Sequence, residues 1–208
     1  SEFYRIIVQL TLTFGSQDYG GSGVLIGPHH VLTCGHNVYK NKKWANNITI
    51  QPALNEGCSP FGKAKAIKSY TFNQWVEHGD SKYDMALLVL DHSIGKYTGW
   101  GSLLCLEDEE LSQQKVNITG YPGDKKFNQM WGMSNTMKTI TDEKFYYEID
   151  TFGGQSGSAI LIHQWGLVPF IIGVHTSGSN RISSGVRLSK NKFKTVHQDL
   201  KKAKISPF

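Results

Sequence analysis

Short stretches rich in apolar and β-branched residues follow one another along the chain, separated by glycine-rich or polar turns. They cover residues 5–14, 24–27, 31–34, 46–51, 64–70, 85–90, 116–120, 129–131, 136–141, 145–149, 159–163, 168–175 and 185–188. We interpret residues 20–23, Gly-Gly-Ser-Gly, as one of the turns. Many short strands with turn signals between them predict an all-β barrel or sandwich.

The C-terminal part of the chain has a different pattern. After Ser189, a suitable helix N-cap, apolar residues recur at helical spacing: Phe193, Val196, Leu200 and Ala203. This spacing predicts an amphipathic helix packed on the body of the protein. A turn-rich stretch at 95–111 marks a junction, so we expect one half at 1–100, a second at 101–190, and a helix and tail at 191–208.

Composition and charge exclude several classes of protein. The chain has 208 residues, of which 39% are hydrophobic and 19% charged, as in a globular protein with a sizeable core. No apolar run approaches the roughly 18 residues that span a bilayer, so we expect no membrane span. The net charge of +5 is spread along the chain rather than clustered as in nucleic-acid binders, so we expect no nucleic-acid partner.

The three cysteines, Cys34, Cys58 and Cys105, show no C-x-x-C spacing and are too few for a disulfide framework. One disulfide is compatible with the sequence, but we expect free and mostly buried thiols. Cys34 and His36 form half of a metal-binding pattern without a second pair, so we expect no metal.

Residues 153–159, Gly-Gly-Gln-Ser-Gly-Ser-Ala, contain three glycines within five residues. Glycines are costly inside a strand, so they indicate a sharp turn whose backbone N–H groups point into open space. Ser156 in such a turn is a candidate nucleophile, and the amides of Gly154 and Ser156 are a candidate oxyanion hole. A plain Gly/Ser turn between two strands is the alternative.

Two further residues suit a catalytic role. His36 lies just beyond an apolar strand, which places it at a rim, and its ordinary pKa near 6.5 suits a general base. Asp84 opens a buried apolar run, where a carboxylate is costly unless it is hydrogen-bonded, and a histidine N–H is a suitable partner. Asp80 and Asp91 are rivals, but both lie in polar turns. A loop histidine bound to backbone is the alternative for His36.

The order His36, Asp84, Ser156 is the order of the catalytic triad in chymotrypsin. Residues 32–36 (Leu-Thr-Cys-Gly-His), 83–88 (Tyr-Asp-Met-Ala-Leu-Leu) and 154–158 (Gly-Gln-Ser-Gly-Ser) resemble the three motifs of the trypsin-like serine proteases. Residues 120–125 (Gly-Tyr-Pro-Gly-Asp-Lys), Trp131 and residues 153–158 resemble the staphylococcal-type glutamyl endopeptidases. The resemblance covers nearly the whole chain.

The resemblance implies two six-stranded antiparallel β-barrels followed by a C-terminal α-helix, with the active site in the cleft between the barrels. It implies a secreted, monomeric serine endopeptidase that acts on proteins or peptides through an acyl-enzyme and needs no cofactor. The small number of cysteines also allows action in a reducing host cytosol. Gln155 and Asn37 depart from digestive trypsin-like enzymes, which have an aspartate and a disulfide cysteine at these places.

The resemblance also implies a substrate pocket. Glutamyl endopeptidases carry a threonine and a histidine at the places of Thr151 and His175, and these side chains receive a glutamate carboxylate. Thr176 and Gly185 are expected at the walls of the same pocket. A histidine bound to backbone in the core is the alternative for His175. For the whole chain, the alternatives are a protease of narrow non-acidic specificity and a non-catalytic binding module with a protease fold.

Overall fold

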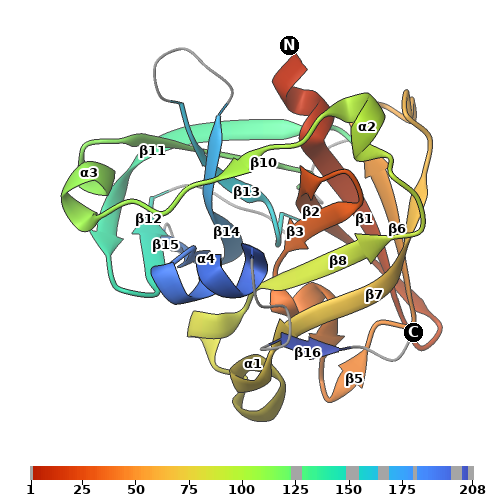
Figure 1. Cartoon of the computed structure of the whole chain (residues 1–208), viewed down its shortest axis with the longest axis horizontal. Helices are drawn as coiled ribbons and strands as arrows, with labels where there is room; N and C mark the ends of the chain where they lie inside the picture. Colours follow the sequence, from red (N-terminus) through yellow and green to blue (C-terminus); the bar gives the residue numbers. More distant parts are fainter. Residues whose placement is uncertain are drawn as a thin grey trace.

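The computed structural model describes residues 2–122, 128–148, 155–163, 169–179, 182–197 and 203–205. Each half of the chain forms a closed antiparallel barrel of six strands, and the two barrels lie side by side (Figure 1). The first barrel contains β1 (Ile7–Phe14), β2 (Gln17–Gly27), β3 (His30–Thr33), β6 (Asn47–Pro52), β7 (Ala64–Phe72) and β8 (Ala86–Leu90). Its strands pair in the order β7-β6-β1-β2-β3-β8, and pairing between β7 and β8 closes it.

The second barrel contains β10 (Lys115–Gly120), β11 (Trp131–Ile140), β12 (Lys144–Tyr147), β13 (Ala159–Ile162), β14 (Phe170–Ser179) and β15 (Ile182–Arg187). Its strands pair in the order β13-β10-β11-β12-β15-β14, and pairing between β13 and β14 closes it. The predicted fold class is therefore confirmed.

Shorter elements decorate the two barrels. They are η1 (Glu2–Ile6), η2 (Gly35–Asn37), β4 (Tyr39–Lys40), β5 (Lys43–Trp44), α1 (Asn73–His78), η3 (Ser81–Tyr83), α2 (Gly95–Thr98), β9 (Ser102–Leu103), α3 (Asp108–Ser112), α4 (Lys190–His197) and β16 (Ala203–Ile205). Strand β9 adds to the second barrel in parallel with β14. Within the described ranges, no helix is long and apolar enough to cross a membrane.

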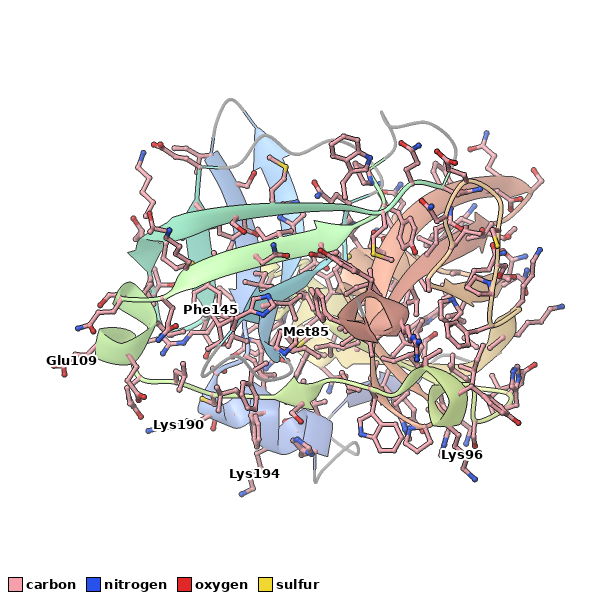
Figure 2. The ribbon with its side chains drawn as sticks, turned by 90° about the horizontal axis from the view of Figure 1, so that it is seen from above. Met85, Lys96, Glu109, Phe145, Lys190 and Lys194 are labelled. Atoms are coloured by element: carbon pink, nitrogen blue, oxygen red, sulfur yellow. The ribbon has the colours of Figure 1, made fainter. Side chains whose placement is uncertain are left out.

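Alternating apolar residues fill the barrels. In β1 the side chains of Ile7, Leu10 and Leu12 are buried, and in β12 those of Phe145 and Tyr147. Figure 2 shows Met85 and Phe145 inside the molecule, whereas the labelled charged residues Lys96, Glu109, Lys190 and Lys194 lie at its periphery. Lys96 belongs to α2 and Glu109 to α3, whereas Lys190 and Lys194 both belong to α4.

The glycines at 20–23 do not form the predicted turn but lie inside β2, and the turn comes earlier, at Gly15 and Ser16. Packing explains the error. A Cβ atom at Gly21 would lie 2.8 Å from Nδ2 of Asn37, and one at Gly23 would lie 2.7 Å from Cγ1 of Val31. These glycines allow neighbouring segments to approach the strand closely, so they serve packing rather than chain reversal.

Two further element predictions need correction. The two strands predicted at 129–131 and 136–141 are replaced by one strand, β11, which begins at Trp131, ends at Ile140 and has an irregularity between Met137 and Thr139. At the C-terminus, helix α4 ends at His197, and Ala203 lies in β16 rather than in the helix. Strand β6 pairs with β7 only at Ala64 and Lys65. The C-terminal residues 70–72 of β7 pair instead with β16. Leu200 lies outside the described residues.

The remaining part of the helix prediction holds. Phe193 and Val196 of α4 pack against the hydrophobic core, as expected from their spacing. Lys192 is also buried, and its ammonium pairs with Glu143 and lies 4.6 Å from the centre of the Tyr83 ring. The helix therefore docks through an apolar face and one paired charge.

All three cysteines are free, as predicted. Only Cys34 is buried, whereas Cys105 is partly exposed and Cys58 is exposed. The expectation of mostly buried thiols was therefore wrong, because Cys58 lies in a surface loop where it forms an isolated bridge with Asn55.

Candidate active site

His36 and Asp84 are brought together at the rim of the first barrel. Strand β3 ends at Thr33, and the single turn η2 places His36 with 22% of its side chain exposed. The Nδ1 atom of His36 lies 2.7 Å from Oδ2 of Asp84, and the backbone N–H of His36 donates to Oδ1 at 2.8 Å. Asp84 is only 5% exposed, so these two bonds satisfy a carboxylate that would be costly to bury alone.

The residue before His36 permits this contact. A Cβ atom at Gly35 would lie 3.0 Å from Oδ1 of Asp84 and 2.9 Å from the Trp75 ring. The two rival carboxylates have other partners. Asp80 accepts from the backbone N–H of Lys82, and Asp91 lies 2.7 Å from the ring of His92.

The surroundings of His36 favour its charged form. Burial lowers the pKa of His36, but the neighbouring Cys34 sulfur and the Asp84 carboxylate together raise it above its ordinary value. Burial raises the pKa of the Cys34 thiol, whereas the charge of the neighbouring His36 lowers it. Because the Nδ1–H group is donated to Asp84, Nε2 is the ring atom that can accept a proton.

Ser156 comes from the second barrel, in the sharp turn that precedes β13. Gly157 has a φ of +89°, and a Cβ atom there would lie 2.1 Å from the backbone oxygen of Ser22. The N–H of Gly157 donates to the His175 carbonyl at 2.8 Å, which ties the turn to β14. Ser156 and His36 line the same cleft, which has a volume of about 570 Å³.

Among the described residues, the hydroxyl of Ser156 bonds to the Thr176 carbonyl at 3.3 Å rather than to His36. The Nε2 atom of His36 lies 3.6 Å from the sulfur of Cys34. The structure thus places Ser156 and His36 at one cleft and joins His36 to Asp84 by hydrogen bonds.

A hydrogen-bond network between the barrels fixes the serine turn. The carbonyl of Ser156 accepts from the N–H of Ser22 at 2.9 Å and from Nδ2 of Asn37 at 2.9 Å. The same Asn37 amide donates to the Thr33 hydroxyl at 3.0 Å, and that hydroxyl donates to the Ser22 carbonyl at 2.8 Å. Sequence reasoning noted Asn37 only as a missing cysteine. Its position directly after His36 was the one signal of its role.

His175 is almost fully buried in β14, with 2% of its surface exposed. Its Nδ1 atom lies 2.7 Å from the hydroxyl of Tyr147, a contact that sequence reasoning missed because nothing in the pattern of β12 distinguishes Tyr147 from a core residue. Burial, helped by the nearby His36, lowers the pKa of His175 to about 3. His175 is therefore neutral at physiological pH.

The other pocket candidates have different surroundings. The Thr176 hydroxyl donates to the Ser184 carbonyl at 3.2 Å. Gly185 pairs with His175 across β14 and β15, and a Cβ atom there would lie 3.1 Å from the Tyr147 hydroxyl. Thr151 and Gly154 lie outside the described residues.

Within the part of the chain that the structure describes, one group of side chains could hold a metal ion. Cys34, His36 and Asp84 each offer a ligand atom, and these three atoms lie within 4.8 Å of one another. Sulfur, imidazole nitrogen and carboxylate oxygen are the ligands that zinc uses in proteins.

Comparison with known proteins agrees with this fold. The family model of the trypsin-like peptidase domain matches residues 21–168. The chain is 31% identical to the extracellular metalloprotease of Bacillus subtilis over 93% of its own length and 63% of that protein. It is 30% identical to the glutamyl endopeptidase of Bacillus licheniformis over 91% of its length and 61% of that protein.

The fold is also similar to solved structures. A Glu endopeptidase in complex with MPD superposes with a TM-score of 0.84 and 29% identity, covering 96% of this chain and 91% of that one. The protein therefore belongs to the family of the trypsin-like peptidase domain. The chain spans less than two thirds of the length of the two Bacillus relatives.

Proposed function

We propose that the chain is a serine endopeptidase in which Ser156, His36 and Asp84 act as a catalytic triad. The observation that carries this proposal is the pair of hydrogen bonds between His36 and Asp84 at a cleft that Ser156 also lines. The carboxylate holds the imidazole in the tautomer whose Nε2 atom is free to accept a proton, which is the role of the aspartate in such triads.

In this mechanism, Ser156 attacks the scissile carbonyl while His36 takes its proton, and the acyl-enzyme is later hydrolysed by water. The serine hydroxyl must first leave the Thr176 carbonyl and turn toward Nε2. Such reorientation is ordinary, because catalytic hydrogen bonds are often long or poorly aligned without substrate. The amides of Gly154 and Ser156 would stabilise the oxyanion.

The experiment is digestion of an unfolded protein such as reduced casein, comparing the wild type with Ser156→Ala. We expect cleavage by the wild type and a loss of several orders of magnitude in the variant, as for removal of a triad member. An equal rate in the folded variant would reject the mechanism. A wild type that cleaves nothing would favour the non-catalytic binding module.

The preferred substrate is a peptide with glutamate before the cut. A Tyr147 hydroxyl that donates to Nδ1 of His175 fixes the proton on Nε2, and this N–H can then donate to a glutamate carboxylate. A hydrogen bond to a charged group contributes roughly 1.5–3 kcal/mol, or about tenfold or more in discrimination. The likeness to two proteins described as glutamyl or Glu endopeptidases supports this preference.

A peptide library tests the preference. We expect the fastest cleavage after glutamate, slower cleavage after aspartate, and little after glutamine, lysine or leucine. His175→Ala should reduce the preference for glutamate more than the reactivity of Ser156. Cleavage after lysine, arginine or large apolar residues would reject the acidic pocket and leave the triad in place.

We also propose the localisation, the oligomeric state and the cofactor requirement of the protein. We expect a secreted protein, in line with the extracellular name of the Bacillus subtilis relative. We expect it to act as a monomer on protein or peptide substrates without a cofactor. Elution from a sizing column at the mass of one 23.3 kDa chain is the expected result.

A further inference from the structure

The candidate base has an unusual neighbour on its catalytic side. The sulfur of Cys34 is completely buried and lies 3.6 Å from Nε2 of His36. The other ring nitrogen, Nδ1, is the one that bonds to Asp84. The proposed mechanism gives Cys34 no role. A thiol and an imidazole nitrogen at this separation are a pair of soft metal ligands.

We propose that Cys34 and His36 bind a thiophilic divalent cation such as Zn²⁺, and that the bound ion switches off the catalytic base. The site itself stands on the geometry alone, whereas the inhibition rests on the proposed function.

The spacing of the two atoms fits zinc. With Zn–S and Zn–N distances of about 2.3 and 2.05 Å, an S–N separation of 3.6 Å gives an S–Zn–N angle of about 112°. A tetrahedral site requires about 109°. The ion can therefore bridge Cys34 and His36 without a change in the separation of their ligand atoms.

Asp84 acts on the proposed site through the His36 ring and does not itself bind the ion. It accepts the Nδ1–H of His36, which orients the ring and makes Nε2 a stronger ligand, as carboxylates do behind zinc-bound histidines. The charges also balance, because one thiolate and one carboxylate neutralise a divalent ion in a largely buried place. One ligand atom from each of Cys34, His36 and Asp84 lies within 4.8 Å of the other two.

The binding step exchanges two protons for the metal. The S–H bond of Cys34 breaks, the sulfur keeps the electron pair and bonds to the ion, and the proton leaves to the buffer. The charged His36 loses its Nε2 proton to the buffer as well, donates the lone pair of Nε2 to the ion and keeps its Nδ1–H. Water from the cleft beside His36 and Ser156 can fill the remaining positions of the ion. While the ion is bound, Nε2 cannot accept the proton of Ser156.

The ligand set selects the metal. A thiolate and an imidazole favour Zn²⁺ and Cd²⁺ over Mg²⁺ and Ca²⁺, which prefer oxygen ligands. The site is thus expected to respond to soft ions at concentrations where hard ions have no effect.

The first experiment titrates Cd²⁺ into the metal-free chain and follows the ultraviolet absorbance of cadmium–thiolate bonds. We expect saturable binding of one ion in the wild type. Cys34→Ser should weaken it more than about 100-fold, since loss of a mere supporting partner already costs 10–100-fold. Cys58→Ser is the matched control and should bind like the wild type. A thiolate band that survives in Cys34→Ser, or disappears in Cys58→Ser, overturns the site.

The second experiment uses only the wild-type chain, so its outcome does not depend on whether a Cys34 variant folds. Nitrogen NMR of the histidine rings should show Zn²⁺ shifting the Nε2 signal of His36 and leaving its Nδ1 proton in place. An unchanged His36 ring at saturating Zn²⁺ rejects the site.

The third experiment separates the site from the function. Zn²⁺ should slow fluorophosphonate labelling of the wild type at least tenfold, Mg²⁺ should not, and chelation should restore the rate. The inactive Ser156→Ala variant should bind Cd²⁺ as tightly as the wild type. If the chain binds the metal but the metal-free chain is not labelled at all, the proposed protease is rejected and the metal site stands. If the metal binds but leaves the labelling rate unchanged, the proposed inhibition is rejected.

Discussion

Asn37 links the two barrels, and its removal is the sharpest test of how the serine turn is held. The Asn37 side chain is 3% exposed and donates two hydrogen bonds, one to the Ser156 carbonyl and one to the Thr33 hydroxyl. The Asn37→Ala change removes both donors. In this variant the Ser156 carbonyl still accepts a hydrogen bond from the N–H of Ser22, so it keeps one partner.

The expected loss follows from these contacts. A typical buried hydrogen bond contributes about 0.5–1.5 kcal/mol, so two lost bonds predict a fall of about 1–3 kcal/mol in the free energy of unfolding. The matched control is Asn46→Ala. Asn46 is exposed and donates only at 3.4 Å, to the carbonyl of Gly15, so its loss should cost less than about 0.5 kcal/mol.

Urea unfolding measures both free energies, and the fluorophosphonate labelling rate of the folded proteins measures the effect on the serine. A serine displaced by about 1 Å can lose about 100-fold in rate, so labelling of Asn37→Ala should slow markedly while that of Asn46→Ala stays at the wild-type rate. If the two variants unfold and label alike, the network does not hold the site.

Three further predictions concern the same region. Because His175 is neutral when folded, with a pKa of about 3, the stability that it contributes is present above its unfolded pKa of 6.5 and is lost as the pH falls below that value. Between pH 7 and 5 the wild type should therefore lose about 2 kcal/mol more than His175→Gln in urea unfolding, and equal losses would contradict the burial argument. Gly157→Ala should destabilise by more than about 2 kcal/mol because of the positive φ and the contact with Ser22, whereas Gly20→Ala, with open space around it, should change stability little in thermal unfolding. Dithiothreitol should leave activity unchanged because all three cysteines are free, and inactivation would reveal a disulfide.

The fold was predictable because short apolar runs and turns report strand periodicity directly. Two errors share one cause, which is tertiary packing. The glycines at 20–23 look like a turn in sequence, but they lie in a strand, where Asn37 packs closely against Gly21 and Val31 against Gly23. Ala203 continues a helical spacing, but the free end of β7 pairs with it as a strand.

The candidate triad was predictable because His36, Asp84 and Ser156 each stand beside a recognisable strand end or turn. The supporting contacts were not, because they join residues that are distant in sequence. Tyr147 and His175 are 28 positions apart, and Asn37 and Ser156 are 119 apart. The sequence also gave no measure of the distance between Cys34 and Nε2 of His36, on which the proposed metal site depends.

Mass-spectrometric mapping of a fluorophosphonate adduct tests the proposed triad most directly, because the probe reports an activated serine without assuming a substrate. The account predicts one adduct in the wild type, on Ser156, and none in Ser156→Ala. It also predicts labelling slowed by about 10⁴-fold in Asp84→Asn, where His36 loses the carboxylate that orients it. An adduct on another residue, or labelling of folded Ser156→Ala at the wild-type rate, would contradict it.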